Sequence, residues 1–114
     1  MKLDEFKTLR KNMRKDDIMV VKFGAEWCKP CKQIKPLVDD QVKCLPQNVK
    51  FYEIDIDKSV ELYIAFKSKK MIKGVPTMLS FLGEGGWDHW YIPDDIVSGT
   101  DECAICNFFE TITP

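Results

Sequence analysis

The most informative stretch of the chain is Trp27-Cys28-Lys29-Pro30-Cys31. It follows an apolar run, residues 18–24, that is typical of a strand covered on both faces, and it precedes a helical pattern over residues 32–45. Two cysteines separated by two residues at a helix start can approach closely enough to form a small disulfide ring. The positive end of the helix dipole favours a thiolate at the first of them. The pair can therefore supply both the attacking and the resolving thiol for thiol–disulfide exchange.

Length and composition are those of one ordinary globular domain, expected to span residues 1–114. The 114 residues are 45% apolar and 31% charged, with a formal net charge of −1. This charge balance argues against a nucleic-acid binder that works through phosphate neutralisation. No apolar run approaches the roughly 20 residues that span a membrane, and the charged residues 1–6 predict no secretory signal. Five cysteines without a signal predict a reducing compartment, the cytoplasm, where such a pair serves redox or metal chemistry.

Hydrophobic periodicity predicts an alternation of helices and strands along the chain. Helices are predicted over residues 3–14, 32–45, 60–71 and 102–112. Strands are predicted over residues 18–24, 49–56, 77–82 and 87–92, the last two joined by a hairpin turn at Gly83-Glu84-Gly85-Gly86. The crossover connections imply parallel pairing and the hairpin implies antiparallel pairing, so the sheet is expected to be mixed, with helices on both faces.

With these elements in this order, the chain resembles the thioredoxin family over nearly its whole length. Residues 25–32 look like the active-site segment of that family, and Pro36 matches the kink of its next helix. Gly74-Val75-Pro76-Thr77 is similar to the cis-proline loop, Ile56-Asp57 to a strand end, and Gly99 to a glycine before the last helix. The resemblance implies an α/β thioredoxin-like fold. Its central mixed sheet would have four strands, because the usual first strand is absent, and four helices would flank it.

The resemblance also implies an activity, that of a thiol–disulfide oxidoreductase that reduces protein disulfides. Cys28 would attack the substrate disulfide, and Cys31 would then resolve the mixed disulfide. No cofactor or metal would be needed in this domain, and a separate reductase or dithiol would recycle the pair. We expect a monomer that acts on disulfide-containing proteins and binds neither nucleic acid nor membrane. The alternatives are a disulfide oxidase or isomerase, and a thioredoxin-like module that binds a partner without turnover.

Three residues of the motif are expected to shape the surroundings of the sulfur atoms. Trp27 would line one side of the site and shield the sulfur atoms, unless it is an ordinary aromatic residue of the core. Lys29 would add a positive charge that favours the Cys28 thiolate, unless it is an ordinary solvated lysine. Pro30, between the cysteines, belongs to the same active-site environment.

The resemblance places a substrate groove at Val75 and Pro76, together with Gly99. A cis bond before Pro76 would face the disulfide and let the Val75 backbone pair with an extended substrate, as in strand addition. The alternative is a trans proline that simply opens the following strand.

Lys22 is a departure from the family, which usually has a buried aspartate at this position. Strand alternation places its side chain on the opposite face from Val21 and Phe23. The resemblance implies that this position lies behind Cys31 and that Glu53, on the neighbouring strand, is a candidate partner. On the functional interpretation, the charge of Lys22 stabilises the Cys31 thiolate. The alternative is that Lys22 extends its stem along the core and reaches water with its amine. Lys29 is a second departure, since the family usually has glycine there.

Cys103 and Cys106 form a second C-x-x-C motif on the last predicted helix. Helical spacing predicts that Cys103 is exposed and that Cys106 lies at the boundary of the buried face. Three interpretations remain open: two incidental thiols, a secondary or regulatory dithiol, and half of a metal site. A four-thiolate zinc site that also uses Cys28 and Cys31 has an acceptable ligand count, but the resemblance places the two pairs at different ends of the fold.

Three further features fall outside these motifs. Cys44 is expected to contribute to helix packing. His89, the single histidine, is expected at the surface. Residues 89–96 form a longer segment than the family hairpin has, and they are a candidate partner surface.

Overall fold

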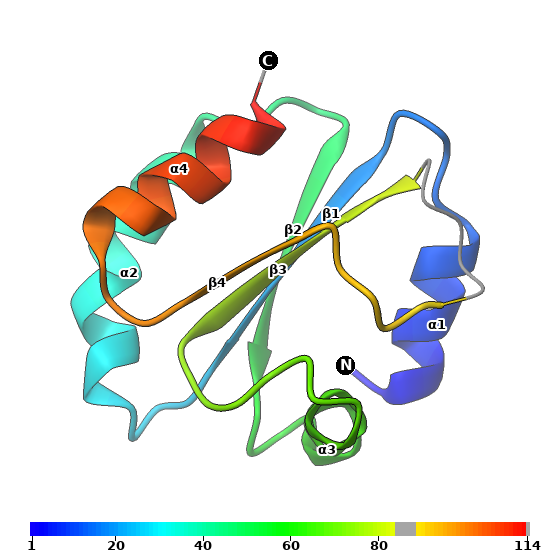
Figure 1. Ribbon diagram of the computed structural model, residues 1–114, viewed down its shortest axis with the longest axis horizontal. Helices are drawn as coiled ribbons and strands as arrows, with labels where there is room; N and C mark the ends of the chain where they lie inside the picture. Colours follow the sequence, from blue (N-terminus) through cyan, green and yellow to red (C-terminus); the bar gives the residue numbers. More distant parts are fainter. Residues whose placement is uncertain (84–88, 114) are drawn as a thin grey trace.

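The computed structural model of the protein describes residues 1–83 and 89–113. Within them the helices and strands alternate as the sequence predicts (Figure 1). In chain order they are α1 Leu3–Lys11, β1 Ile18–Gly24, α2 Lys29–Lys43, β2 Val49–Asp55, α3 Val60–Ser68, β3 Thr77–Leu82, β4 Asp95–Ser98 and α4 Glu102–Ile112. None of the helices in this described part of the chain has both the length and the apolar character of a membrane span.

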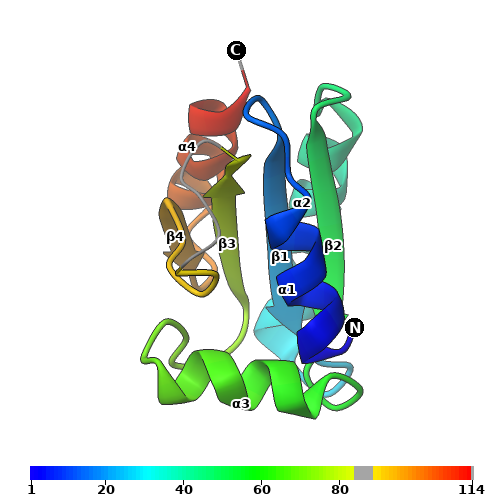
Figure 2. The same ribbon diagram turned by 90° about the vertical axis from the view of Figure 1, so that its right-hand side faces the viewer.

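The strands form one mixed sheet in the order β2-β1-β3-β4. β1 pairs with β2 in parallel, whereas the β1–β3 and β3–β4 pairs are antiparallel. α1 and α3 cover one face of the sheet, and α2 and α4 cover the other (Figures 1 and 2). The predicted four-stranded mixed sheet with four flanking helices is therefore confirmed.

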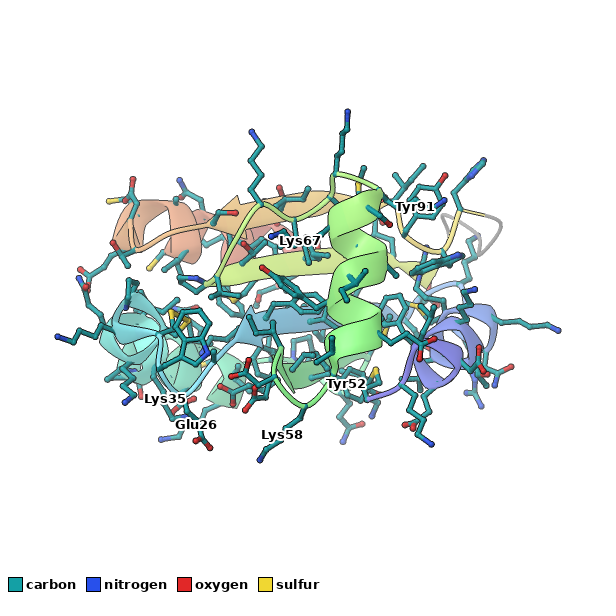
Figure 3. All side chains as sticks on the ribbon, turned by 90° about the horizontal axis from the view of Figure 1, so that it is seen from below. Glu26, Lys35, Tyr52, Lys58, Lys67 and Tyr91 are labelled. Carbon is teal, nitrogen blue, oxygen red and sulfur yellow. A yellow bond between two sulfur atoms is a disulfide. The ribbon has the colours of Figure 1, made fainter. Side chains whose placement is uncertain are left out.

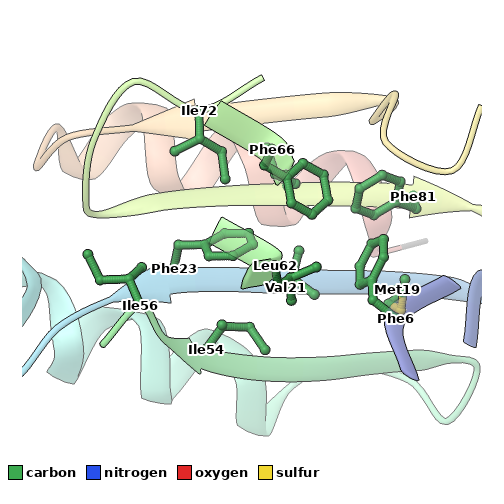
Figure 4. Packing of buried hydrophobic residues seen from close by; sticks show 11 residues of the cluster. Phe6, Met19, Val21, Phe23, Ile54, Ile56, Leu62, Phe66, Ile72 and Phe81 are labelled. Carbon is green, nitrogen blue, oxygen red and sulfur yellow. The ribbon is translucent and has the colours of Figure 1, made fainter. Parts of the chain in front are cut away.

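β1 is one of the two interior strands, and its side chains are apolar on both faces, apart from Lys22. Val21 and Phe23 join the core under α1 and α3, while Val20 joins the core under α2 and α4. Phe66 of α3 lies at the centre of the first of these cores (Figure 4). Its ring contacts Phe6, Phe23, Phe81 and Trp90 in mainly edge-to-face geometry, with ring centroids 5.3 to 6.3 Å apart.

The predicted strand over residues 87–92 is wrong, because the strand that pairs with β3 is Asp95–Ser98. Of the predicted segment, residues 89–91 form turns, and residues 87–88 lie outside the described residues. Most of the predicted hairpin turn, residues 84–86, lies outside them as well. The pairing with β3 begins at Asp94, whose backbone N–H donates to the Ser80 carbonyl at 2.8 Å and whose Oδ2 accepts from the Leu82 N–H at 2.7 Å.

The indole of Trp90 packs against the core instead of extending along a strand. Its ring contacts Phe6 and Phe66, and its carbonyl accepts a hydrogen bond from Nε of Arg10 at 3.3 Å. Burial lowers the pKa of the Arg10 guanidinium, and the charge of Asp94 opposes that shift. These contacts attach the segment before β4 to α1.

Three predicted helices have different bounds in the structure. α1 ends at Lys11 rather than at residue 14, and α3 ends at Ser68 rather than at residue 71. α2 begins at Lys29, directly after Cys28, and includes Pro36. The early start of α2 matters for function, because it places the cysteine pair on the first turn of a helix.

Candidate active site

The two cysteines of the motif are joined by a disulfide at the amino end of α2, with their Cα atoms 5.3 Å apart. Cys28 is the N-cap residue, and its Sγ accepts a hydrogen bond from the Cys31 backbone N–H at 3.2 Å. One of the backbone donors that a helix start leaves without a helical partner therefore points at this sulfur. In the reduced protein the same donor and the helix dipole would stabilise a Cys28 thiolate.

The local sequence explains how this geometry forms. β1 ends at Gly24, and the chain turns at once, with the Cys28 N–H donating to the Ala25 carbonyl at 3.1 Å. Cys28 has an extended backbone, φ −84° and ψ 105°, as N-cap residues do. Pro30 lies in the first turn of α2, where its missing N–H costs no hydrogen bond.

Exposure does not distinguish the two sulfur-bearing residues, since Cys28 is 3% exposed and Cys31 is 6% exposed. Their positions on the helix do distinguish them. Cys28 caps the helix, whereas Cys31 lies inside the first turn, packed on the last residue of β1. A Cβ atom built on Gly24 would lie only 3.4 Å from the Cys31 Sγ. The second sulfur therefore lies directly beside the end of β1.

Trp27 is 65% exposed, so the interpretation of it as a core aromatic is wrong. Its indole Nε1 donates to Oδ2 of Asp57 at 2.8 Å. This bond ties the exposed ring of Trp27 to the segment that follows β2. Lys29 is exposed at the first position of α2. The role of Asp57 was not found by sequence reasoning, although parallel strands that end at the same sheet edge predict such proximity.

Lys22 is buried behind the disulfide, with a side chain that is 4% exposed, and its Nζ lies 3.3 Å from Oε1 of Glu53. The predicted partner of Lys22 is confirmed. The ammonium group therefore faces a carboxylate rather than reaching water alone. Lys35 of α2 approaches the other oxygen of Glu53 at 3.9 Å. Lys22, Lys35, Glu53 and Cys31 line a pocket of about 360 Å³.

We expect Lys22→Met to slow the second step of disulfide exchange. Lys22 and Gly24 lie on the same face of β1, about 7 Å apart along the strand, and a Cβ atom built on Gly24 would lie 3.4 Å from the Cys31 sulfur. Removing a buried positive charge at this distance is expected to destabilise the Cys31 thiolate and slow its attack about tenfold near neutral pH. The measurement is the release of thionitrobenzoate from a mixed disulfide preformed on Cys28.

Lys35→Met is the matched control, because the Lys35 side chain is half exposed and its charge is screened by water. The rate of thionitrobenzoate release from Lys22→Met should rise to that of the unmodified protein at alkaline pH, where the Cys31 thiolate forms without the charge of Lys22. Equal release rates in Lys22→Met and the unmodified protein across the whole pH range would show that Lys22 does not act on Cys31.

A groove of about 480 Å³ brings together the three residues of the predicted substrate groove, Val75, Pro76 and Gly99. The Val75–Pro76 peptide bond is cis. Gly99 has a φ of 87°, and its N–H donates to the Pro76 carbonyl at 3.1 Å. The lining does not include Cys28 or Cys31. The loop is nevertheless next to the motif in the fold, because Thr77 pairs with Phe23 near the end of β1.

The second C-x-x-C motif lies along α4, away from the disulfide. Cys103 is exposed and Cys106 is partly buried, as predicted. The Cys106 sulfur accepts a hydrogen bond from Nε2 of Gln41 at 3.9 Å. Gln41 follows Cys31 by ten residues on α2, which corresponds to about 15 Å along the helix axis. Among the described residues, no group of three or more Cys, His, Asp or Glu side chains could hold a metal ion.

Two other predicted residues have clear positions. Cys44 is exposed at the carboxyl end of α2, so the prediction that it contributes to helix packing is wrong. The helical pattern extended past Lys43, the last residue of α2, and so placed Cys44 inside the helix. His89 is exposed, as predicted.

Comparison with known proteins identifies the family of the chain. The family model described as Thioredoxin matches residues 2–109. The thioredoxin of Rickettsia bellii is 34% identical over 76 residues, which are 66% of this chain and 69% of that protein. The chloroplastic thioredoxin M2 of Arabidopsis thaliana is 35% identical over 65 residues, 57% of this chain but 33% of that protein. The crystal structure of Malassezia sympodialis thioredoxin superposes with a TM-score of 0.73 at 26% identity, covering 99% of this chain and 89% of that one.

Proposed function

Because the chain belongs to the thioredoxin family, it is a thiol–disulfide oxidoreductase, and we propose that Cys28 and Cys31 are the pair with which it reduces protein disulfides. The observation that carries this assignment is their disulfide at the amino end of α2, where a backbone N–H points at the Cys28 sulfur. A module that only binds a partner is not favoured, because binding alone does not require two cysteines in this geometry.

The proposed cycle has two exchange steps. The Cys28 thiolate attacks one sulfur of the substrate disulfide, forms a mixed disulfide and releases the other substrate sulfur as a thiolate, which takes a proton. Cys31, once deprotonated, attacks the Cys28 sulfur, breaks the mixed disulfide and releases the second substrate thiol. The substrate gains two electrons, and the protein is left with the Cys28–Cys31 disulfide. A separate reductase or dithiol returns two electrons, and no cofactor is needed in this domain.

The groove beside Pro76 is the proposed binding site for an extended substrate segment. None of the hydrogen bonds among the described residues uses the Val75 N–H or carbonyl. The Pro76 carbonyl, in contrast, is occupied by the Gly99 N–H. A substrate chain can therefore pair with Val75 by adding a short strand, while Trp27 covers the other side of the sulfur atoms.

The proposed setting is a reducing compartment, the cytoplasm, with the protein acting as a monomer. Cys44 and Cys103 are free, exposed thiols, and such thiols persist where thiols are kept reduced. The net charge of −1 supports partners that are proteins rather than nucleic acids.

A Cys31→Ser variant tests the proposed roles of the two cysteines. Cys28 is expected to form a mixed disulfide with a disulfide-containing substrate such as insulin, and the missing resolving thiol should leave that adduct stable. The adduct is measured by mass spectrometry after digestion without reductant. The matched control is the double variant Cys28→Ser/Cys31→Ser, which should trap nothing. Trapping on Cys103 or Cys44 instead of Cys28 would contradict the assignment.

The alternative of an oxidase or isomerase uses the same pair in the opposite direction. The equilibrium between the Cys28–Cys31 pair and glutathione distinguishes the two directions. The dithiol/disulfide pair of a reductant has a more negative reduction potential than that of an oxidant. A pair that the glutathione buffer of a reducing compartment converts almost completely to the dithiol would have the higher potential of an oxidant and would favour the alternative.

A further inference from the structure

We propose that the groove beside Pro76 selects disulfide substrates that carry an acidic side chain close to the reacting cysteine. This inference rests on the proposed function, since it concerns the substrate of the same site. The ten residues that line the groove include two lysines, Lys70 and Lys73, and no acidic residue. Apolar side chains, among them Val75 and Ile96, form most of the rest. The groove thus combines apolar side chains with two positive charges.

The lysines around the end of α3 fall into two groups. The ammonium groups of Lys67 and Lys69 lie over tyrosine rings, 5.5 and 4.6 Å from the ring centroids. Lys70 and Lys73 instead line the groove, and neither forms an ion pair within the described part of the chain. The positive charge that faces a bound substrate therefore comes from Lys70 and Lys73.

The backbone of Lys70 indicates that this lysine is not an incidental surface residue. Its φ is 62°, the one positive φ of a non-glycine residue in the described chain. The N–H of Met71 reaches back to the Phe66 carbonyl at 3.0 Å, which marks a helix end where glycine is the usual residue at this position. A lysine here is strained relative to glycine. Such outliers occur at functional sites, where the side chain has a use that offsets the strain.

The opposite side of the site carries both signs of charge. Glu26, Glu53 and Asp55 line the pocket behind Cys31 together with three lysines, Lys22, Lys32 and Lys35. In Figure 3, Glu26 lies toward the β2 edge of the sheet, whereas Lys67 and Tyr91 lie toward the β4 edge. Of the two sides of the disulfide, only the groove beside Pro76 is lined by lysines without carboxylates, so an acidic substrate segment is attracted to the groove rather than to the pocket.

Strand addition at Val75 relates the two lysines to the substrate sequence. Lys73 precedes Val75 by two residues, which bend at Gly74 and Val75, so the two residues lie at most about 7 Å apart along the chain. A substrate residue near the one that pairs with Val75 would therefore lie within reach of Lys73. The acidic side chain is expected within about four residues of the reacting cysteine, given this spacing and the reach of a lysine side chain.

The test compares three disulfide peptides that differ at one position near the cysteine, where they carry Glu, Gln or Lys. At low salt, kcat/KM for the Glu peptide should exceed that for the Lys peptide by about five- to tenfold, the size expected of two exposed ion pairs. The preference should shrink as salt is added. In the double variant Lys70→Asn/Lys73→Gln the ratio should fall to about one, since asparagine tolerates the left-handed backbone at residue 70.

The matched control is Lys15→Gln/Lys50→Gln, which removes the same charge from two exposed lysines at the opposite end of the sheet. It should keep the full preference for the Glu peptide. Equal kcat/KM for all three peptides in the unmodified protein, or an unchanged ratio in Lys70→Asn/Lys73→Gln, would overturn the groove proposal while leaving the proposed function intact. Reduction of none of the peptides would contradict the proposed function itself.

Discussion

Replacing Cys28 with serine is expected to lower the rate of disulfide reduction to that of the buffer reductant alone. A serine hydroxyl is not ionised near neutral pH and cannot form a mixed disulfide. The Cys31 thiol cannot take over the attack, because it lies inside the first turn of α2 and packs on Gly24. The measurement is the precipitation of insulin during reduction by dithiothreitol, with and without the variant.

The matched control for Cys28→Ser is the double variant Cys103→Ser/Cys106→Ser. It removes a second cysteine pair of the same spacing that lies on α4, beside Gln41 and away from the disulfide. This control is expected to keep the activity of the unmodified protein. If it loses most of its activity while Cys28→Ser retains some, the second pair takes part in the reaction, and the interpretation of Cys103 and Cys106 as incidental thiols is wrong.

Phe66→Ala is expected to have the largest effect on stability. Phe66 is fully buried, and its ring contacts aromatic rings from α1, β1, β3 and the segment before β4. Truncation removes these contacts and leaves a cavity, so the free energy of unfolding should fall by about 3–5 kcal/mol. Since small domains are stable by only about 5–15 kcal/mol in total, much of the stability would be lost. The measurement is unfolding of the oxidised protein by urea.

Ile64→Ala on the same helix is the control, because Ile64 is 57% exposed. Its effect on the free energy of unfolding should stay within about 0.5 kcal/mol. If both variants lower the stability equally, the aromatic cluster around Phe66 does not hold α3 on the sheet.

The features that the sequence predicted correctly are those set by neighbouring residues. The apolar run of β1, the C-x-x-C motif after it and the amphipathic helix that follows are all local patterns. They place both cysteines on a helix start before any tertiary contact is considered. The pairing of Lys22 with Glu53 was also predicted, but it needed the family resemblance, which implied that the two strands are neighbours.

The last strand shows where local patterns are insufficient. Residues 87–92 are rich in aromatic residues, and the glycines before them favour a tight hairpin, so the sequence predicted a strand there. In the structure Trp90 fills a space against Phe6 and Phe66, and pairing with β3 starts only at Asp94. Whether an aromatic residue extends along a sheet or packs into a core depends on the volume that distant elements leave open.

By itself, then, the sequence determined the order of the elements, the mixed sheet and the two cysteines that carry the chemistry. The tertiary structure decided what surrounds those cysteines: the bond from Trp27 to Asp57, the groove beside Pro76 and the lysines that line it. The physical reason is the separation along the sequence over which each effect acts. Periodicity and helix capping act over a few residues, whereas the groove is assembled from the end of α3, the loop before β3 and the end of β4, which meet only when the sheet has formed.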